Sequence, residues 1–201
     1  MSTTASERPE PAWDVARLYP NQGAWDEEDY LMLPGNHLVE FDDGRVEVLP
    51  MPTTLHQLIV MYLYRALFGF ASPADLGTVL TAPLRVRLRP GKFREPDVIF
   101  MLAKHAHRVQ ERWWDGADLV MEVVSKDADD RNRDLVTKRA EYAQAGIPEY
   151  WIVDPEEATI TVLTLARGKY KVAGVYGDAE KAKSVLLAGF EVEVKSALAG
   201  K

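Results

Sequence analysis

The chain has 201 residues, of which 47% are hydrophobic and 27% are charged, a balance that favours one globular domain with short tails. It contains no cysteine, which excludes disulfide frameworks, cysteine zinc sites, iron–sulfur clusters and thiol catalysis. The formal net charge is −7, whereas a purely electrostatic nucleic-acid binder is usually strongly basic. Contact with nucleic acid would therefore need a local basic patch or a metal ion, held by oxygen or imidazole ligands.

The two ends of the chain are predicted to lie outside the folded domain. Residues 1–24 are rich in Ser, Thr, Pro and Glu, which is typical of a mobile arm. The arm lacks the apolar core of a secretory signal, and no apolar run approaches the roughly 20 residues of a membrane span. We therefore expect a cytoplasmic protein with no membrane partner, one domain over residues 25–195, and a C-terminal tail over residues 196–201.

The first part of this domain predicts two helices and a hairpin. Asp26 precedes a short acidic helix over residues 27–33, and two short apolar runs around an Asp-Gly turn predict a β-hairpin over residues 37–49. Apolar residues then recur at helical spacing over residues 54–70, which predicts a long amphipathic helix. Thr53 or Thr54 could cap this helix.

The rest of the chain predicts mainly strands. Strands are expected over 78–89, 95–102, 117–124, 149–154, 159–165, 170–175 and 190–194. A polar connection covers 103–116, and a second long helix covers 131–145. This order predicts an α/β fold in which a mixed β-sheet is flanked by two long helices, with an additional antiparallel ribbon.

Two acidic residues are associated with predicted apolar strands, one inside a strand and one at the start of another. Glu122 interrupts the apolar run from Leu119 to Val124, and a buried carboxylate needs a cation partner, a metal or an open strand end. Asp97 follows Pro96 and opens the apolar strand beginning at Val98, although an aspartate there can also be a simple turn residue. Two carboxylates on neighbouring strands would suit Mg²⁺ or Mn²⁺.

Three further side chains are candidates for the same site. Lys138 lies at the margin of the sheet-facing side of the second helix, although it could equally be a solvated lysine paired with Asp134. Glu40 breaks an apolar run in the hairpin, and an edge glutamate is the alternative interpretation. His56 opens the first long helix, where a capping or packing role competes with that of a general base.

Other polar and aromatic positions give weaker signals. His37, His105 and His107 have no convincing metal-ligand context, and Trp113 and Trp114 could be packing or interface aromatics. The one dense basic cluster is a candidate phosphate-contacting rim, with a solvated strand face as the alternative. It consists of Arg85, Arg87, Arg89, Lys92 and Arg94.

Several of these segments resemble a known family. Pro96-Asp97 and Glu122-Val123-Val124 are similar to the PD-(D/E)XK nuclease signature, except that Val124 stands where that signature has a lysine. Residues 39–44, 122–125 and 146–155 are similar to the Uma-two family of predicted endonucleases, and the likeness extends over roughly residues 25–175. In that family the lysine resides on the following helix, at the place of Lys138.

The resemblance implies a restriction endonuclease-like fold and metal-dependent hydrolysis of phosphodiester bonds, in DNA or in another phosphodiester. It implies Mg²⁺ or Mn²⁺ bound by Asp97 and Glu122, with Glu40 as an additional ligand and Lys138 orienting water or neutralising charge. The alternative is a nuclease-fold module that binds or assembles without catalysis. We also expect a homodimer, with the 159–175 ribbon and the Trp113-Trp114 pair as candidate contacts.

Overall fold

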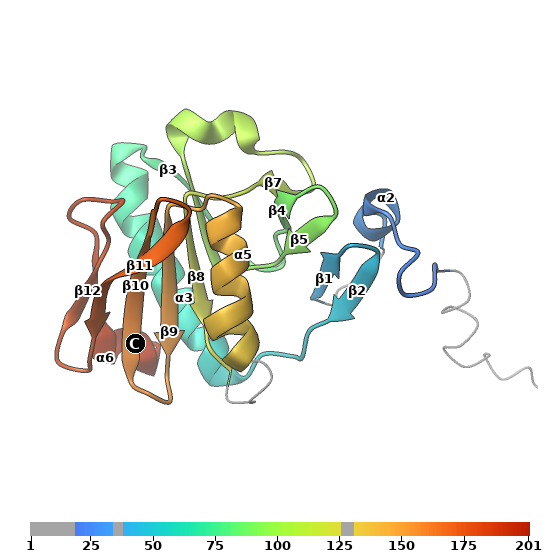
Figure 1. Cartoon of the computed structure of the whole chain (residues 1–201). Coiled ribbons are helices and arrows are strands. Elements are labelled where there is room, and N and C mark those ends of the chain that lie inside the picture. The colour runs from blue at the N-terminus through green and yellow to red at the C-terminus, as the bar shows by residue number, and fades with distance from the viewer. Residues whose placement is uncertain (1–18, 34–37, 126–130) are drawn as a thin grey trace, which may run out of the picture.

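The computed structural model describes residues 19–33, 38–125 and 131–201. Its main sheet has six strands in the order β11-β10-β9-β8-β6-β3, and only the β8–β9 pair is parallel. These strands are β3 (Gly77–Thr81), β6 (Val98–Leu102), β8 (Leu119–Val123), β9 (Glu149–Asp154), β10 (Thr159–Ala166) and β11 (Lys169–Tyr176). The expected ribbon, β10 with β11, is thus the outer part of this sheet (Figure 1).

A second sheet has five short strands in the order β2-β1-β5-β4-β7. They are β1 (Val39–Asp42), β2 (Arg45–Val48), β4 (Val86–Arg89), β5 (Lys92–Arg94) and β7 (Trp114–Asp115). A third pairing joins β12 (Lys181–Lys183) to β13 (Glu191–Glu193). The sequence therefore predicted a mixed α/β fold correctly, but it indicated one sheet where the described residues form two and a small pair.

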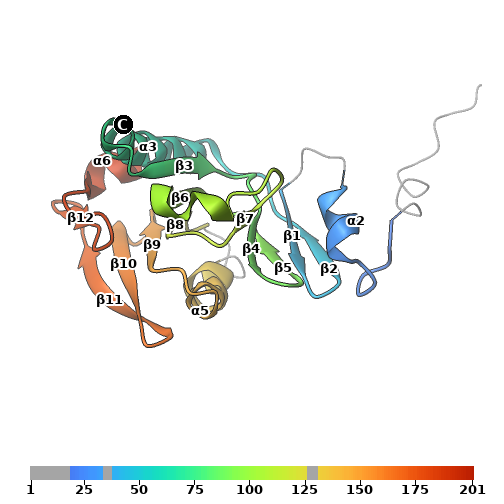
Figure 2. The same cartoon turned by 90° about the horizontal axis from the view of Figure 1, so that it is seen from above.

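Two long helices cover opposite faces of the main sheet (Figure 2). On one face lies α3 (Thr54–Ala71), and on the other lies a helix that contains a π-helical turn, Arg133–Thr137, and continues as α5 (Lys138–Gln144). The shorter helices are α2 (Glu27–Leu31), α6 (Val194–Ala199) and the 3₁₀ turns Ser72–Ala74 and Ala103–Arg108.

Each face of the main sheet has its own apolar core. Because side chains alternate along a strand, Leu119 and Met121 of β8 pack with the core under α3, which includes Leu63. Val120 and Val124 pack with Tyr142 in the core under α5. Because Glu122 lies on the same face of β8 as Val120 and Val124, its side chain points toward α5 and finds its partners there.

Three boundaries differ from the sequence prediction. The strand predicted over 78–89 is divided between the two sheets because Pro83, which has no backbone N–H, cannot continue a ladder. The tail predicted over 196–201 is wrong in part, since α6 extends to Ala199 and buries Ala197. Residues 1–18 of the predicted arm lie outside the described residues.

The arm prediction is also wrong for residues 19–24. Tyr19 stacks on Trp25, and the backbone N–H of Gly23 donates a hydrogen bond of 2.7 Å to the carbonyl of Gly44. These contacts attach the segment to the β1–β2 turn. Among the described residues, no helix combines the length and apolarity that crossing a membrane requires.

Candidate functional site

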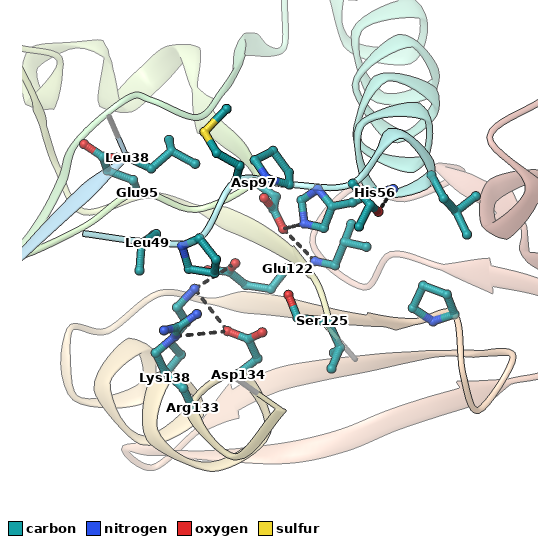
Figure 3. A pocket seen from close by; sticks show the side chains of 18 of the residues that line it. Leu38, Leu49, His56, Glu95, Asp97, Glu122, Ser125, Arg133, Asp134 and Lys138 are labelled. Carbon is teal, nitrogen blue, oxygen red and sulfur yellow. Dashed lines mark hydrogen bonds and ion pairs between the residues drawn. The ribbon is translucent and has the colours of Figure 1, made fainter. Parts of the chain in front are cut away.

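The two carboxylates singled out in the sequence lie together at one end of the main sheet. In the antiparallel β6–β8 pair, Val98 lies opposite Met121, so one further step of the register places Asp97 opposite Glu122. The backbone N–H of Val123 donates a hydrogen bond of 2.8 Å to Oδ2 of Asp97, which fixes this carboxylate beside β8. Figure 3 shows both carboxylates facing one space.

Glu122 is buried, and its partners come from the helix that packs over it. The Nζ of Lys138 lies 3.0 Å from Oε2 of Glu122, and the hydroxyl of Tyr142 donates a hydrogen bond to Oε1. Burial raises the pKa of the Glu122 carboxyl; the Lys138 ammonium opposes this, whereas Asp97 and Asp134 add to it. Of the alternatives left open by the sequence, pairing with a cation is therefore the one realised.

Lys138 is a buried cation, so the interpretation as a solvated surface lysine is wrong. Its side chain is only 4% exposed and its Nζ lies 3.2 Å from Oδ1 of Asp134 and 3.8 Å from Oε1 of Glu40. Burial alone would lower the pKa of Lys138, but Glu122 and the other carboxylates hold it above its ordinary value. The surrounding carboxylates therefore favour the charged ammonium form of Lys138.

His56 joins the site from the start of α3. Thr53 caps this helix, because its hydroxyl accepts a hydrogen bond of 3.2 Å from the backbone N–H of His56. The cap leaves the imidazole beside the sheet end, where Nε2 lies 3.2 Å from Oδ2 of Asp97. Burial lowers the pKa of His56, but the hydrogen bond and charge of Asp97 outweigh it and raise the pKa overall.

Glu40 does not reach the site as expected. Its carboxylate is fully buried and lies 3.2 Å from Nη1 of Arg94, and the cleft beside Asp97 and Glu122 is lined by other residues. Glu40 therefore lies behind Lys138 as part of an ion-pair network. Glu40 is not among the residues that line the cleft beside Asp97 and Glu122, so this position does not favour Glu40 as a metal ligand.

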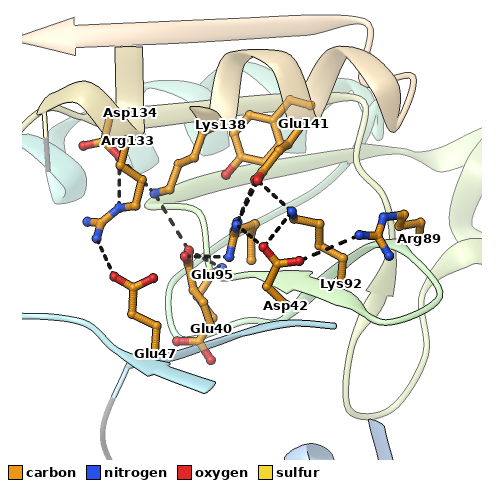
Figure 4. Close-up of polar contacts among 12 residues, drawn as sticks. Glu40, Asp42, Glu47, Arg89, Lys92, Glu95, Arg133, Asp134, Lys138 and Glu141 are labelled. Atoms are coloured by element: carbon orange, nitrogen blue, oxygen red, sulfur yellow. Dashed lines mark hydrogen bonds and ion pairs between the residues drawn. The ribbon is translucent and has the colours of Figure 1, made fainter. Parts of the chain in front are cut away.

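Each of the five cations of the predicted basic rim contacts a carboxylate, and contact of this rim with phosphate stays a prediction. Figure 4 shows part of this network, in which the small sheet meets α5 through Glu141. The shortest ion pairs join Arg85 to Glu95, Arg87 to Glu27, Arg89 to Asp43, Lys92 to Glu141 and Arg94 to Glu141. Lys92 and Arg94 thus join the small sheet to α5, and Arg87 joins it to α2, whereas Arg89 pairs with the β1–β2 turn of the same sheet. Strand alternation alone does not reveal these partners.

The carboxylates line a cleft of about 300 Å³ between the small sheet, α3 and the helix over Glu122. Its lining includes residues that the sequence analysis did not select, among them Glu95, Arg133 and Asp134. Glu95 accepts a hydrogen bond of 3.1 Å from the backbone N–H of Val39, yet burial raises its pKa to about 7. Asp134, four residues before Lys138, was interpreted only as a surface partner of that lysine. The sequence did not show that Asp134 is buried, which is what places it in the site.

The comparisons with known proteins bear on this arrangement. The model of the Uma2 family, described as "Putative restriction endonuclease", matches residues 27–195 and so includes every residue of the site. The chain belongs to the Uma2 family. The crystal structure of "a putative nuclease belonging to DUF820" from Anabaena variabilis is similar with a TM-score of 0.69 and 16% identity. The match covers 86% of this chain and 97% of that one, which confirms the restriction endonuclease-like fold. No curated protein matches the chain.

This Uma2 chain supplies the cation of its site from a helix. Val124, at the position where the PD-(D/E)XK signature has lysine, is 3% exposed and packs in the core under α5. Lys138 reaches Glu122 from α5, across the space that a strand lysine would approach along β8. The site therefore has an acidic pair and one ammonium, although they come from three separate elements.

Proposed function

We propose that this Uma2 protein is a metal-dependent endonuclease that hydrolyses phosphodiester bonds in DNA. The observation that carries the proposal is the meeting of Asp97, Glu122 and Lys138 at one end of the main sheet, inside an open cleft. The family description supports nuclease chemistry.

The chemistry of the cleft lining fits Mg²⁺ or Mn²⁺. Five acidic side chains line it, against the basic His56, Arg133 and Lys138, so the lining is acidic overall and would repel a phosphodiester. Among the described residues, no three His, Asp or Glu side chains form a ready-made chelating group. Mg²⁺ commonly uses one or two carboxylates together with water and substrate phosphate, which matches a site built from Asp97 and Glu122.

The bound ion would polarise the phosphate and lower the pKa of water. The protein's own residues have separate tasks in this reaction. Asp97 is held by Val123 and His56, and Glu122 is held by Tyr142 and Lys138, so both carboxylates are oriented before substrate arrives. The Lys138 ammonium would stabilise the negative charge that develops as the water oxygen bonds to phosphorus and the ester P–O bond breaks. The proton released by the attacking water would pass to solvent, and the departing ester oxygen would take up a proton from solvent.

The test is nicking of supercoiled plasmid DNA by the purified protein with Mg²⁺ or Mn²⁺. Glu122→Gln keeps the size of the side chain and should abolish nicking, whereas Glu28→Gln, on the exposed surface of α2, should nick like the wild type. Thermal melting of both variants checks that they fold. Equal nicking by wild type and Glu122→Gln would contradict the proposed function.

One observation favours a binding module without catalysis. Both oxygens of Glu122 already have partners within the protein, Lys138 and Tyr142, so the carboxylate is satisfied without an ion. Calorimetric titration with Mn²⁺ separates the two functions. Micromolar binding that is lost in Asp97→Asn supports the nuclease, and a wild type that binds no Mn²⁺ supports the module.

We also propose that two copies associate through the β10–β11 ribbon, where Val172 and Val175 are more than half exposed. The Trp113-Trp114 pair is not a suitable contact, because Trp114 is 2% exposed and packs in the core under α5. Light scattering coupled to size exclusion tests this. A monomer at all concentrations would contradict the association.

A further inference from the structure

The electrostatics of the cleft disfavour a continuous duplex as its ligand. Double-stranded DNA carries about one charge per 1.7 Å of helix, and proteins that bind it usually offer many cations to its phosphates. None of the five cations of the basic cluster lines the cleft, and each of them contacts a carboxylate, as Arg89 and Lys92 illustrate. The cations that do line the cleft, Arg133 and Lys138, also contact carboxylates, so the cleft offers few cations to a run of duplex phosphates.

An apolar wall lines part of the same cleft as the carboxylates. It is formed by the connection between β2 and α3 together with the first turn of that helix: Leu49, Pro50, Met51, Pro52 and Leu55. Met51 is 80% exposed and Leu55 is 43% exposed, although both are large apolar side chains. Exposed apolar surface beside a polar catalytic group is typical of a ligand site.

The wall is also preformed. Pro50 and Pro52 each fix one backbone dihedral of the connection, which reduces the entropy that this segment would lose on binding. The cleft volume of about 300 Å³ is at the small end of the range for ligand sites. A space of this kind suits one flat, partly apolar group placed next to the reacting phosphate. Enzymes that accept a base removed from its stack hold it between apolar or aromatic side chains in this way.

From this geometry we propose that the cleft receives an unpaired nucleotide, whose base lies against the wall formed by residues 49–55 while its phosphate meets Asp97 and Glu122. The preferred substrate is then nucleic acid that is single-stranded or carries an unpaired base, rather than a continuous duplex. This inference rests on the proposed nuclease function, and it adds the class of substrate.

The first experiment compares cleavage of three oligonucleotide substrates of one sequence, with Mg²⁺ present. They are a single strand, a duplex with one bulged nucleotide and a fully paired duplex. We expect the first two to be cut at least about tenfold faster than the third, the factor that about 1.4 kcal/mol of base contact provides. Equal or faster cutting of the paired duplex would overturn the inference and leave the nuclease proposal standing. No cutting of any substrate would refute the nuclease proposal.

The second experiment measures binding without hydrolysis, by fluorescence anisotropy of labelled oligonucleotides with Ca²⁺ in place of Mg²⁺. Met51→Ser should weaken binding of the single strand by about tenfold, because it removes apolar contact area next to the base. The matched control is Met32→Ser, since Met32 is 65% exposed and does not line the cleft. Equal affinities of wild type and Met51→Ser, or tighter binding of the paired duplex, would overturn the inference whatever the cleavage results.

Discussion

Replacing Lys138 by Met tests whether one ammonium balances the buried carboxylates of the site. The Nζ lies 3.0 Å from Glu122 and 3.2 Å from Asp134, and the side chain is 4% exposed. Removing one partner of such a buried pair usually costs about 3–5 kcal/mol. We expect the lower end of this range, because burial and the charges of Asp97 and Asp134 raise the pKa of Glu122 and so ease its protonation once the ammonium is gone.

The assay is urea unfolding at neutral pH, with the midpoint and the slope both measured. Lys138→Met should lower the midpoint without changing the slope, since the surface exposed on unfolding is unaltered. Adding Glu122→Gln to this variant removes the unpaired charge and should restore at least about 1 kcal/mol. Lys195→Met, on the exposed side of α6, should stay within about 0.5 kcal/mol of the wild type. A Lys138→Met protein as stable as this control would refute the reasoning.

Four more changes have expected outcomes. Asp97→Asn should weaken Mn²⁺ binding at least about tenfold in a calorimetric titration, and unchanged affinity would argue against a metal held by this carboxylate. Thr53→Ala should lower the free energy of unfolding by about 1 kcal/mol through loss of the α3 cap, whereas Thr53→Ser should retain most of it. Leu63→Ala, fully buried under α3, should cost about 2–5 kcal/mol by leaving a cavity, which thermal or urea unfolding measures. Burial raises the pKa of Asp154, but the guanidinium of Arg131 and hydrogen bonds from two backbone N–H groups outweigh burial and hold this pKa below its ordinary value. Asp154→Asn should therefore destabilise the protein at neutral pH, and the difference from wild type should disappear as the pH falls through the folded-state pKa; a difference independent of pH would contradict this.

The parts of the fold that could be predicted are those in which apolar residues recur at the regular spacing of a helix or a strand. The helix of α3 and the strand β8 follow directly from apolar spacing, and the same spacing makes Glu122 conspicuous. The sequence could not show that β3 and β4, on either side of Pro83, belong to different sheets. A proline indicates that a strand is interrupted, but it does not indicate which sheet the next strand joins.

The site was predictable where a charged residue stands within or next to an apolar segment of the sequence. Glu122 interrupts an apolar strand and Asp97 immediately precedes another, and both line the cleft. Tyr142 was not selected, because a tyrosine on the buried face of a helix looks like ordinary packing until its hydroxyl is seen to meet Glu122. The partners of the basic cluster were not predictable from the sequence for a related reason: alternation assigns Arg87 and Arg89 to one face of a strand, but the carboxylates that contact them come from distant segments.

The helix beside the cleft makes an ion pair to each of the two sheets. On successive turns it presents Lys138 to Glu122 of the main sheet and Glu141 to Arg94 of the small sheet, with ion-pair distances of 3.0 Å and 2.8 Å. The main sheet and the small sheet are thus joined to one helix, and moving them apart would break an ion pair whose side chains are largely buried. This double attachment opposes any widening of the cleft between the two sheets.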